Sequence, residues 1–404
     1  MDFNDTPEEA KFRSEARAFL DANLKPKLRG REPGGGGDEL ARSKAYQKKK
    51  ADAGFSGITW PKEHGGRGLP AIFQVIFGQE EGKYEPLGGP FIIGLGMCVP
   101  TIISMGTDAQ RERFVAKALN GEEIWCQLFS EPSAGSDVAA ARTRAVKDGE
   151  DWIVNGQKVW TSGAHISDWG LLLVRTDPEL PKHKGLTMFI VNMKDPGVEV
   201  RPIHQMSGGS NFNEVYFTDV RIADAMRVGG VGEGWKVALV TLMNERLAVG
   251  GSPGPDYAEI LELARRLSGP SGQGALLQDP AFRQKLADWY VSAEGYKLGR
   301  FRTMTALSKG GVPGPESSIG KIINANRLQD ITNAAIEAQD HYGIVAQDGP
   351  DGVFGDAYLW APGLRIAGGS DEILKNIIAE RVLGLPQDPR ADKDVAFKDL
   401  PTGR

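Results

Sequence analysis

The sequence predicts an α+β fold in which a middle antiparallel β-domain separates two helical regions. In residues 1–122 and 233–388 the apolar residues recur at the 3- and 4-residue spacing that is typical of helices. Residues 123–232 instead alternate apolar and polar residues, which is typical of strands. We therefore expect an N-terminal helical domain, a middle β-domain and a C-terminal helical bundle, followed by a polar, loosely held tail at residues 389–404.

The N-terminal region begins with a helix signal. Thr6, Pro7 and Glu9 have the order of a capping box with a proline in the first turn, and the opening residues lack the apolar core of a secretion signal. Residues 87–107 carry no charge, but glycines and two prolines interrupt them. Since a membrane-spanning helix needs about 20 mostly apolar residues in a row, we interpret this run as buried helices.

The middle region contains two turn signals, Asp-Gly at 148–149 and Asn-Gly at 155–156, between short β-rich runs. It lacks the alternating helices of a parallel nucleotide-binding sheet. The glycine-rich stretch GGVGEG at residues 229–234 follows no strand-turn-helix unit. We therefore interpret it as a linker into the C-terminal bundle and not as a phosphate-binding loop. In that bundle we expect four or five helices.

Composition narrows the function classes. The 404 residues carry 48 Lys and Arg against 53 Asp and Glu, a net charge of −5, which favours neither nucleic acid nor an anionic membrane as partner. The two cysteines, Cys98 and Cys126, cannot form a disulfide framework, which fits a reducing cytoplasm. The five histidines are scattered, so we expect no metal site.

An acidic residue interrupts a strongly apolar helix pattern in the C-terminal region. Glu245 continues the stripe of Ala238, Leu242 and Val249, which helical spacing places on one face. Burying an unpaired carboxylate is costly or forces it to take up a proton. Two interpretations follow: Glu245 is a structural ion-pair partner held by a basic residue or a helix end, or it is a functional base in a protected pocket.

Two segments of the middle region suggest a ligand site. FSEPSAGSD at residues 129–137 offers backbone N–H groups and the hydroxyls of Ser130 and Ser136. NGQKVWTSGA at residues 155–164 places Trp160 before two hydroxyl residues at the end of a strand. Each segment alone is typical of a turn or a packed strand end. Together they favour a site for a flat heteroaromatic cofactor.

Five segments carry a resemblance to a known family. EIWCQLFSEPSAGSD, VNGQKVWTSGAHISDWGLLLVRTD, FNEVYFTDVRI, GEGWKVALVTLMNER and RIAGGSDEILKNIIAERVLG are similar, in this order, to segments of the acyl-CoA dehydrogenases, and the similarity runs from about residue 50 to 388. Within the family, the chain most resembles bacterial enzymes, some of which act on bulky or steroid-side-chain CoA thioesters. The resemblance implies FAD as cofactor, α,β-desaturation of an acyl-CoA substrate, electron transfer to an electron-transfer flavoprotein, and a cytoplasmic tetramer.

The resemblance also implies roles for individual residues. The base that removes the α-proton would be Glu245, in a pair with Arg246, because the position that carries the base in many members is Gly368 here. Arg246, Ser136 and Gly369 would contact the substrate. Trp160 would cover the flavin, and the full set of flavin contacts would be Gln127, Ser130, Ser136, Trp160, Ser162, Ser370 and Glu372.

One departure from the family pattern leaves the assembly open. Family members usually carry an Arg-x-x-Phe-Gly segment after the helix of the base, which reaches the FAD of a neighbouring subunit. This chain has ARRLSGPSGQGALLQDPAF there, at residues 264–282. We therefore expect either a homo-oligomer or a heterotetramer with a second acyl-CoA dehydrogenase-like chain.

Two other functions also stay open on the same fold. The first is an acyl-CoA oxidase or flavin monooxygenase, in which the reduced flavin meets oxygen. The second is a non-catalytic partner subunit that stabilises an active sister chain. The presence of Glu245, Trp160, Ser130 and Ser136 argues against this second alternative.

Overall fold

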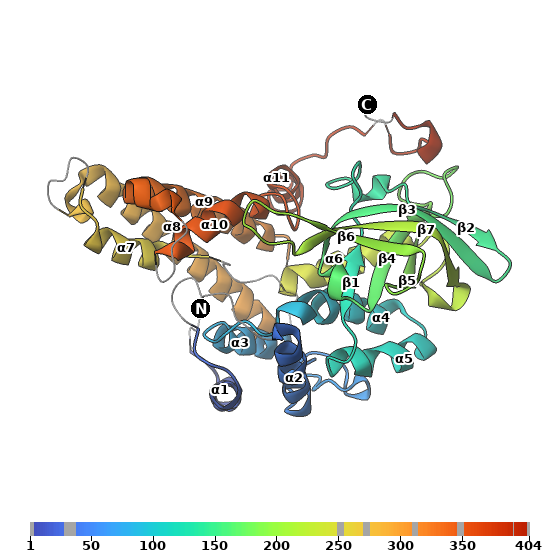
Figure 1. Cartoon of the computed structure of the whole chain (residues 1–404), viewed down its shortest axis with the longest axis horizontal. Coiled ribbons are helices and arrows are strands. Elements are labelled where there is room, and N and C mark those ends of the chain that lie inside the picture. The colour runs from blue at the N-terminus through green and yellow to red at the C-terminus, as the bar shows by residue number, and fades with distance from the viewer. Residues whose placement is uncertain are drawn as a thin grey trace. The chain divides into compact units, whose positions relative to one another are not determined.

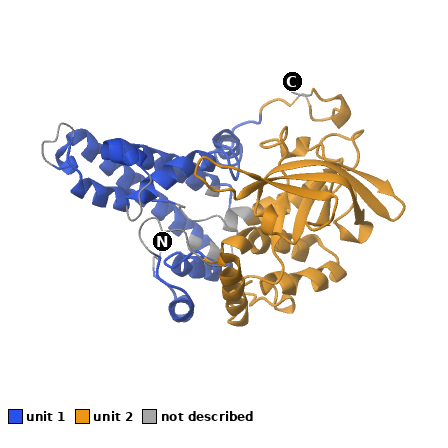
Figure 2. Ribbon diagram, viewed as in Figure 1, with its two compact units in different colours: residues 1–37, 70–86, 250–387 blue, residues 38–69, 87–249, 388–404 orange. Residues whose placement is uncertain are grey.

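The computed structural model describes residues 4–27, 38–248, 254–269, 275–308, 314–345, 351–390 and 392–401, with the backbone alone at 245–248, 304, 307–308 and 317. The chain forms two compact units (Figure 2). Unit 1 comprises residues 1–37, 70–86 and 250–387, and unit 2 comprises residues 38–69, 87–249 and 388–404. The helices that precede the β-domain in the sequence are thus divided between the units. The domains expected from the sequence pattern are successive stretches of the chain, whereas each compact unit combines separate segments. The expected domain boundaries therefore stay predictions.

Unit 2 contains the β-sheet (Figure 1). In the described part of the chain the sheet has eight strands in the order β6-β7-β3-β2-β4-β5-β8, with β1 added beside β4. The pairings are antiparallel except that β4 runs parallel to β1 and β2, which confirms the predicted class of the middle domain. The strands are β1 (Trp125–Leu128), β2 (Arg144–Asp148), β3 (Asp151–Ser162), β4 (Trp169–Arg175), β5 (Leu186–Asn192), β6 (Val198–Ile203), β7 (Phe212–Ala223) and β8 (Arg227–Val228).

The two predicted turns have different outcomes. Asp-Gly at 148–149 forms the turn between β2 and β3, with its glycine at a φ of +61°. The turn predicted for Asn-Gly at 155–156 is wrong, because these residues lie inside β3 at a shift of register with β7. Asn155 there exchanges hydrogen bonds with Asp219, at 2.9 and 3.0 Å. The glycine serves a close approach and not a turn, since a Cβ at this position would lie 2.7 Å from Thr143.

The helices α4 (Val99–Met105), α5 (Asp108–Leu119) and α6 (Gly234–Ala248) share a hydrophobic core with the sheet in unit 2. Helix α2 (Glu39–Asp52) belongs to the same unit and packs against α5. Phe114 of α5 packs edge-on against Trp125 and Trp169, with ring centroids 5.2 and 5.0 Å apart. The uncharged run 87–107 forms short helical pieces with buried side chains, as predicted. Among the described residues, no helix combines the length and the apolar character that a membrane crossing requires.

Helix α6 begins on the predicted apolar stripe. Ala238 is buried and Leu242 is half-buried. The glycine-rich stretch 229–234 connects β8 to this helix. The side chains of Glu245 and Arg246, which lie farther along α6, fall outside the described residues, so their roles stay predictions.

Unit 1 is helical. Its helices are α1 (Pro7–Asn23), α3 (Ala71–Glu81), α7 (Tyr257–Arg266), α8 (Pro280–Ser308), α9 (Ser317–Gln339), α10 (Gly352–Leu364) and α11 (Asp371–Ile377). The helices α7 to α10 pack around a core that includes Leu263, Trp289, Ile331 and Phe354. With α6, the described part of the C-terminal region holds six helices against the four or five expected, and five of them belong to unit 1.

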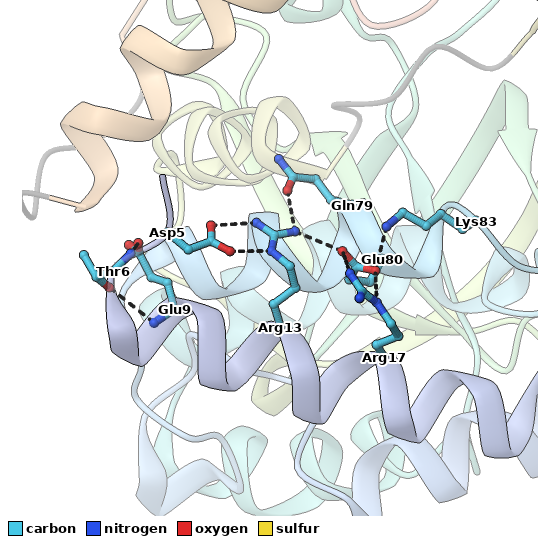
Figure 3. Close-up of polar contacts among 8 residues, drawn as sticks. All are labelled: Asp5, Thr6, Glu9, Arg13, Arg17, Gln79, Glu80 and Lys83. Atoms are coloured by element: carbon cyan, nitrogen blue, oxygen red, sulfur yellow. Dashed lines mark hydrogen bonds and ion pairs between the residues drawn. The ribbon is translucent and has the colours of Figure 1, made fainter. Parts of the chain in front are cut away.

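The predicted capping box at the start of α1 is confirmed (Figure 3). The backbone N–H of Glu9 donates to Thr6 Oγ1 at 3.2 Å, and the backbone N–H of Thr6 donates to Glu9 Oε2 at 2.8 Å. These bonds pair donors that a helix N-terminus otherwise leaves unsatisfied. Pro7 occupies the first turn, where its missing N–H has no consequence for the helix.

A network of ion pairs joins α1 to α3 (Figure 3). Arg13 of α1 bonds both carboxylate oxygens of Asp5, at 2.6 and 2.8 Å, and Glu80 of α3 at 3.0 Å. Glu80 has 2% of its side chain exposed and also bonds Arg17 and Lys83, at 3.2 and 2.7 Å. Burial by itself raises the pKa of Glu80. The hydrogen bonds from its three cationic partners outweigh burial and lower the pKa to about 2. The carboxylate stays charged and links the two helices.

The prediction of a loosely held tail at residues 389–404 is wrong for its described part. Phe397 has only 6% of its surface exposed, and its backbone N–H donates to the carbonyl of Leu180 at 3.0 Å. An aromatic residue and backbone hydrogen bonds hold this segment in unit 2. A polar composition indicates neither of them.

Candidate functional site

A buried ion pair fixes the loop of residues 129–141, which follows β1. Lys158 of β3 has no exposed side-chain surface, Glu131 of the loop has 4%, and their Nζ and Oε1 atoms lie 2.7 Å apart. The two carboxylate oxygens of Glu131 also accept the backbone N–H groups of Arg142, at 2.6 Å, and Thr143, at 2.9 Å. A buried charge with this many partners holds its surroundings in one arrangement.

The same contacts set the charge state of Glu131. Burial raises the pKa of its carboxyl group, but the charge of Lys158 and the hydrogen bonds outweigh burial, so the pKa lies below the ordinary value. Glu131 is therefore ionised at neutral pH. Because its oxygens are all occupied within the fold, the residue is an anchor for the loop and not a free base.

The loop and the end of β3 bring several predicted site residues together. The carbonyl of Ser130 accepts the backbone N–H of Val159 at 2.9 Å, directly before Trp160. Ser130 and Ser162 are half-buried, and Gln127 at the start of the same segment is half-buried as well. Ser136 lies farther along the loop, and its side chain is exposed. The hydroxyl groups and the indole thus come from two segments that are bonded to each other.

Trp160 has an unusual backbone and an unusual exposure. Its φ of +60° lies in the left-handed region, at a shift of register between β3 and β7. The residue is 58% exposed although its ring contacts that of Phe212 edge-on, with centroids 6.3 Å apart. A non-glycine residue in this region carries strain of roughly 1–3 kcal/mol, and such strain is concentrated at functional sites. An exposed indole face offers a stacking surface for a flat ring.

Two unpaired polar atoms lie beside Trp160. Thr161 Oγ1 and Asn213 Oδ1 are buried and have no hydrogen-bond partner among the described residues. The residues are neighbours across β3 and β7, since Asn213 Nδ2 donates to the carbonyl of Thr161 at 2.9 Å. Buried polar atoms without partners are rare in proteins and call for an explanation such as a ligand or a water molecule. The exposed Trp160 and the half-buried Ser130 and Ser162 fit a flat polar cofactor such as a flavin, whereas the two buried atoms have no surface that such a ligand could reach.

A second group of predicted site residues lies in unit 1, in the turn before α11. Gly368 and Gly369 have φ values of +65° and +94°, which a glycine adopts without strain. Ser370 is the N-cap of α11 and accepts the backbone N–H of Ile373. Glu372 is exposed in the first turn, where its own backbone N–H and the hydroxyl of Ser370 lower the pKa of its carboxyl group.

Buried charges hold this turn in place. Lys321 of α9 donates to the carbonyl of Gly369 at 2.7 Å. Asp371 is buried and accepts the guanidinium of Arg365 at 2.7 and 2.6 Å. Lys321 of α9 and Arg365, directly after α10, therefore hold the backbone of the turn. The polar side chains on the exposed face of the turn take no part in these contacts.

Sequence reasoning identified the exposed residues of both groups but missed the anchors Glu131, Lys158, Lys321 and Asp371. A signal for one of them was present: Lys158 stands directly before Val159 and Trp160 in a β-rich run, and a lysine on the inner face of a sheet requires an acid partner. Among the described residues, no group of three or more His, Cys, Asp or Glu side chains could hold a metal ion.

Comparison with known proteins identifies relatives along the whole chain. Residues 6–122, 126–220 and 232–383 match the models of the acyl-CoA dehydrogenase N-terminal, middle and C-terminal domains. The acyl-CoA dehydrogenase IpdE1 of Mycobacterium tuberculosis is 35% identical over 388 residues, which cover 94% of this chain and 98% of the relative.

Two solved structures extend the similarity to the fold. The ChsE4–ChsE5 complex of Mycobacterium tuberculosis aligns with a TM-score of 0.77 at 28% identity, over 96% of this chain and all of the matched chain. The complex described as the Tcur3481–Tcur3483 steroid ACAD aligns with a TM-score of 0.77 at 26% identity, also over 96% of this chain and all of the matched chain.

Proposed function

Since the chain belongs to the acyl-CoA dehydrogenase family, we propose that it is an FAD-dependent oxidoreductase that forms the Cα–Cβ double bond of a bulky or steroid-side-chain acyl-CoA. The observation that carries the proposal is the strained and exposed Trp160 beside the fixed loop 129–141. The steroid description of a structural relative supports the class of acyl group.

The proposed cofactor contacts come from the family resemblance, and the arrangement at the end of β3 supports several of them. Trp160 would cover the flavin ring, Ser162 would bond near its reactive nitrogen N5, and the half-buried Ser130 would bond to the same cofactor. Gln127, Ser136, Ser370 and Glu372 complete the proposed set. When bound, FAD supplies the acceptor for the hydride that leaves Cβ.

The proton chemistry would fall to Glu245. A thioester α-proton is only weakly acidic, so its removal requires a positioned carboxylate whose pKa burial has raised towards neutrality. Ala238, four residues into α6, is buried, which supports a protected position farther along the same stripe. Arg246, Gly369 and Ser136 would position the thioester. Gly368, where many relatives of this family carry the base, would leave room for a bulky acyl group.

The proposal extends to the assembly and to the electron acceptor. The missing Arg-x-x-Phe-Gly segment and the two-chain composition of the relatives' complexes favour a heterotetramer with a second acyl-CoA dehydrogenase-like chain over a homo-oligomer. The electrons would pass to an electron-transfer flavoprotein, and the enzyme would work in the cytoplasm.

A panel of CoA thioesters, from short chains to steroid side chains, tests this function. Each is mixed without oxygen with the FAD-loaded protein, purified with its partner chain, and bleaching of the flavin absorbance is followed by stopped flow. We expect the fastest bleaching with the bulky substrates. Rapid reoxidation by air would instead indicate an oxidase or monooxygenase. Flavin that no thioester bleaches would indicate a non-catalytic subunit.

A further inference from the structure

The C-terminal segment of residues 392–401, called the strap below, lies on the loop that joins β4 to β5. The backbone N–H groups of Phe397 and Lys398 donate to the carbonyls of Leu180 and Pro178, at 3.0 Å each, and the strap belongs to the same compact unit as the sheet (Figure 2). The matched C-terminal domain model ends at residue 383, so the strap lies beyond the matched domain models.

The ring of Phe397 covers a buried arginine that holds the far end of loop 129–141. The guanidinium carbon of Arg175 lies 3.8 Å from the centroid of this ring. Arg175 donates to the carbonyls of Ala139 at 2.6 Å and Ala141 at 3.3 Å, and to that of Lys182 at 2.7 Å. Burial lowers the pKa of Arg175 to about 10, which still leaves it charged at neutral pH. A desolvated cation on an aromatic face is a favourable contact, and the guanidinium carbon of Arg142 lies 5.2 Å from the centroid of the same ring.

A second contact joins the strap to the same loop through one ammonium group. Lys182 Nζ lies 2.7 Å from Asp137 Oδ2 of the loop and 2.6 Å from Asp392 Oδ2 of the strap, and the lysine side chain is only 11% exposed. Asp392 also lies 3.5 Å from Arg390. Burial by itself lowers the pKa of Lys182. The two carboxylates outweigh burial and raise the pKa above its ordinary value, so the ammonium group of Lys182 stays charged.

We propose that the strap positions loop 129–141 for ligand binding, with Phe397 acting through Arg175 and Asp392 acting through Lys182. The inference rests on the proposed function, because this loop carries Ser130 and Ser136, the proposed contacts of flavin and thioester. Glu131 and Lys158 hold the start of the loop. The strap holds its end, so the exposed residues between the two supports are kept in one conformation before a ligand arrives.

The test uses three variants of the full chain, purified with the partner chain if one is needed for flavin binding. Phe397→Ala removes the ring that lies on Arg175, and Asp392→Asn removes the negative charge that pairs with Lys182, with little change in size. Lys398→Gln is the matched control, because Lys398 lies on the same strap but pairs with exposed Glu179 at 2.7 Å. Asp392→Glu, which restores the charge, serves as the rescue variant.

Hydrogen–deuterium exchange of the amides at residues 131–141 is the readout that does not depend on activity. We expect faster exchange there in Phe397→Ala and Asp392→Asn, and wild-type exchange in Lys398→Gln and Asp392→Glu. In turnover, the KM for acyl-CoA should rise about tenfold in Phe397→Ala while kcat changes less than twofold, a coupling of ordinary size for two linked sites.

Unchanged exchange at residues 131–141 in both Phe397→Ala and Asp392→Asn would overturn the positioning role. So would equal effects of these variants and of the Lys398→Gln control. A wild-type protein that binds neither FAD nor any thioester would overturn the proposed function and, with it, the role of the strap in ligand binding. The exchange data would then report on the loop contacts alone, which separates the two failures.

Discussion

The buried pair of Glu131 and Lys158 allows a quantitative test of how loop 129–141 is supported. In Lys158→Met the side chain keeps a similar length but loses its charge, so Glu131 stays buried without its main partner. Removing one member of a buried ion pair costs about 3–5 kcal/mol of unfolding free energy. Because the N–H groups of Arg142 and Thr143 still bond to the carboxylate, we expect the lower end, about 3 kcal/mol.

The same change should alter the pH dependence of stability. In the wild type, the lowered pKa of Glu131 contributes stability that is present above the ordinary carboxyl value and is lost as the pH falls through the folded-state pKa. In Lys158→Met the charge of Lys158 no longer offsets the burial of Glu131, so the pKa of Glu131 rises. At neutral pH the ionised carboxylate then lowers the stability of the folded state. The stability difference between wild type and variant should therefore shrink from pH 8 to pH 5, by at most about 1.4 kcal/mol per pH unit for one proton.

Thermal unfolding, followed by near-UV circular dichroism at pH 5, 6.5 and 8, measures both effects. At about 2–4 °C per kcal/mol for a unit of this size, the midpoint should fall by roughly 6–12 °C at pH 8. Arg201→Met is the control, because Arg201 pairs with Glu199 at 2.7 Å on the surface, where solvent screens the pair, so its loss should leave the midpoint close to that of the wild type. Adding Glu131→Leu to Lys158→Met should restore much of the loss. A variant that unfolds within about 2 °C of the wild type at pH 8 would refute the anchoring role.

Three further predictions concern the base, the assembly and the N-terminal helices. Glu245→Gln should slow anaerobic flavin bleaching by about 10²–10⁴-fold without loss of bound FAD, whereas a structural role would lower stability and flavin content and leave the rate per bound FAD within tenfold. The chain expressed alone should bind less than one FAD per subunit, and co-expression with a partner chain should raise the flavin-to-protein absorbance ratio; a fully loaded homotetramer would contradict this. Glu80→Gln should destabilise unit 1 by about 2 kcal/mol at pH 7, discounted because Arg17 and Lys83 are exposed. Since the pKa of Glu80 lies near 2 in the folded chain, this difference should fade in urea unfolding as the pH drops from about 4.5 towards 2.

The fold was predictable where it depends on local pattern. Alternation of apolar and polar residues indicated the sheet, and the order Thr6, Pro7 and Glu9 indicated the start of α1. Asn-Gly at 155–156 shows the limit of such signals, because the dipeptide that makes a turn also suits a bulge. Its conformation is decided by Asp219, 64 positions away in sequence, which a local pattern does not contain.

The candidate site was predictable in its exposed residues and not in its supports. Ser130 and Trp160 stand in recognisable motifs, so their neighbourhood at the end of β3 could be expected. The pair of Lys158 and Glu131 spans 27 positions, and the contact between Arg175 and Phe397 joins β4 to the end of the chain. Composition described the tail as polar, yet a buried aromatic side chain, an ion pair and backbone hydrogen bonds hold its described part.

The two supports of loop 129–141 differ in burial, and this difference predicts different consequences. The Glu131–Lys158 pair is almost fully buried, so its loss leaves a charge without water and should affect folding itself. Asp137 and Asp392 are both partly exposed, so water can replace Lys182 at a small cost in stability. Loss of the Lys182 bridge alone should therefore leave the protein folded and change mainly how loop residues meet a ligand. A support that is dispensable for folding but coupled to binding is a place where this chain can differ from its relatives without loss of the fold.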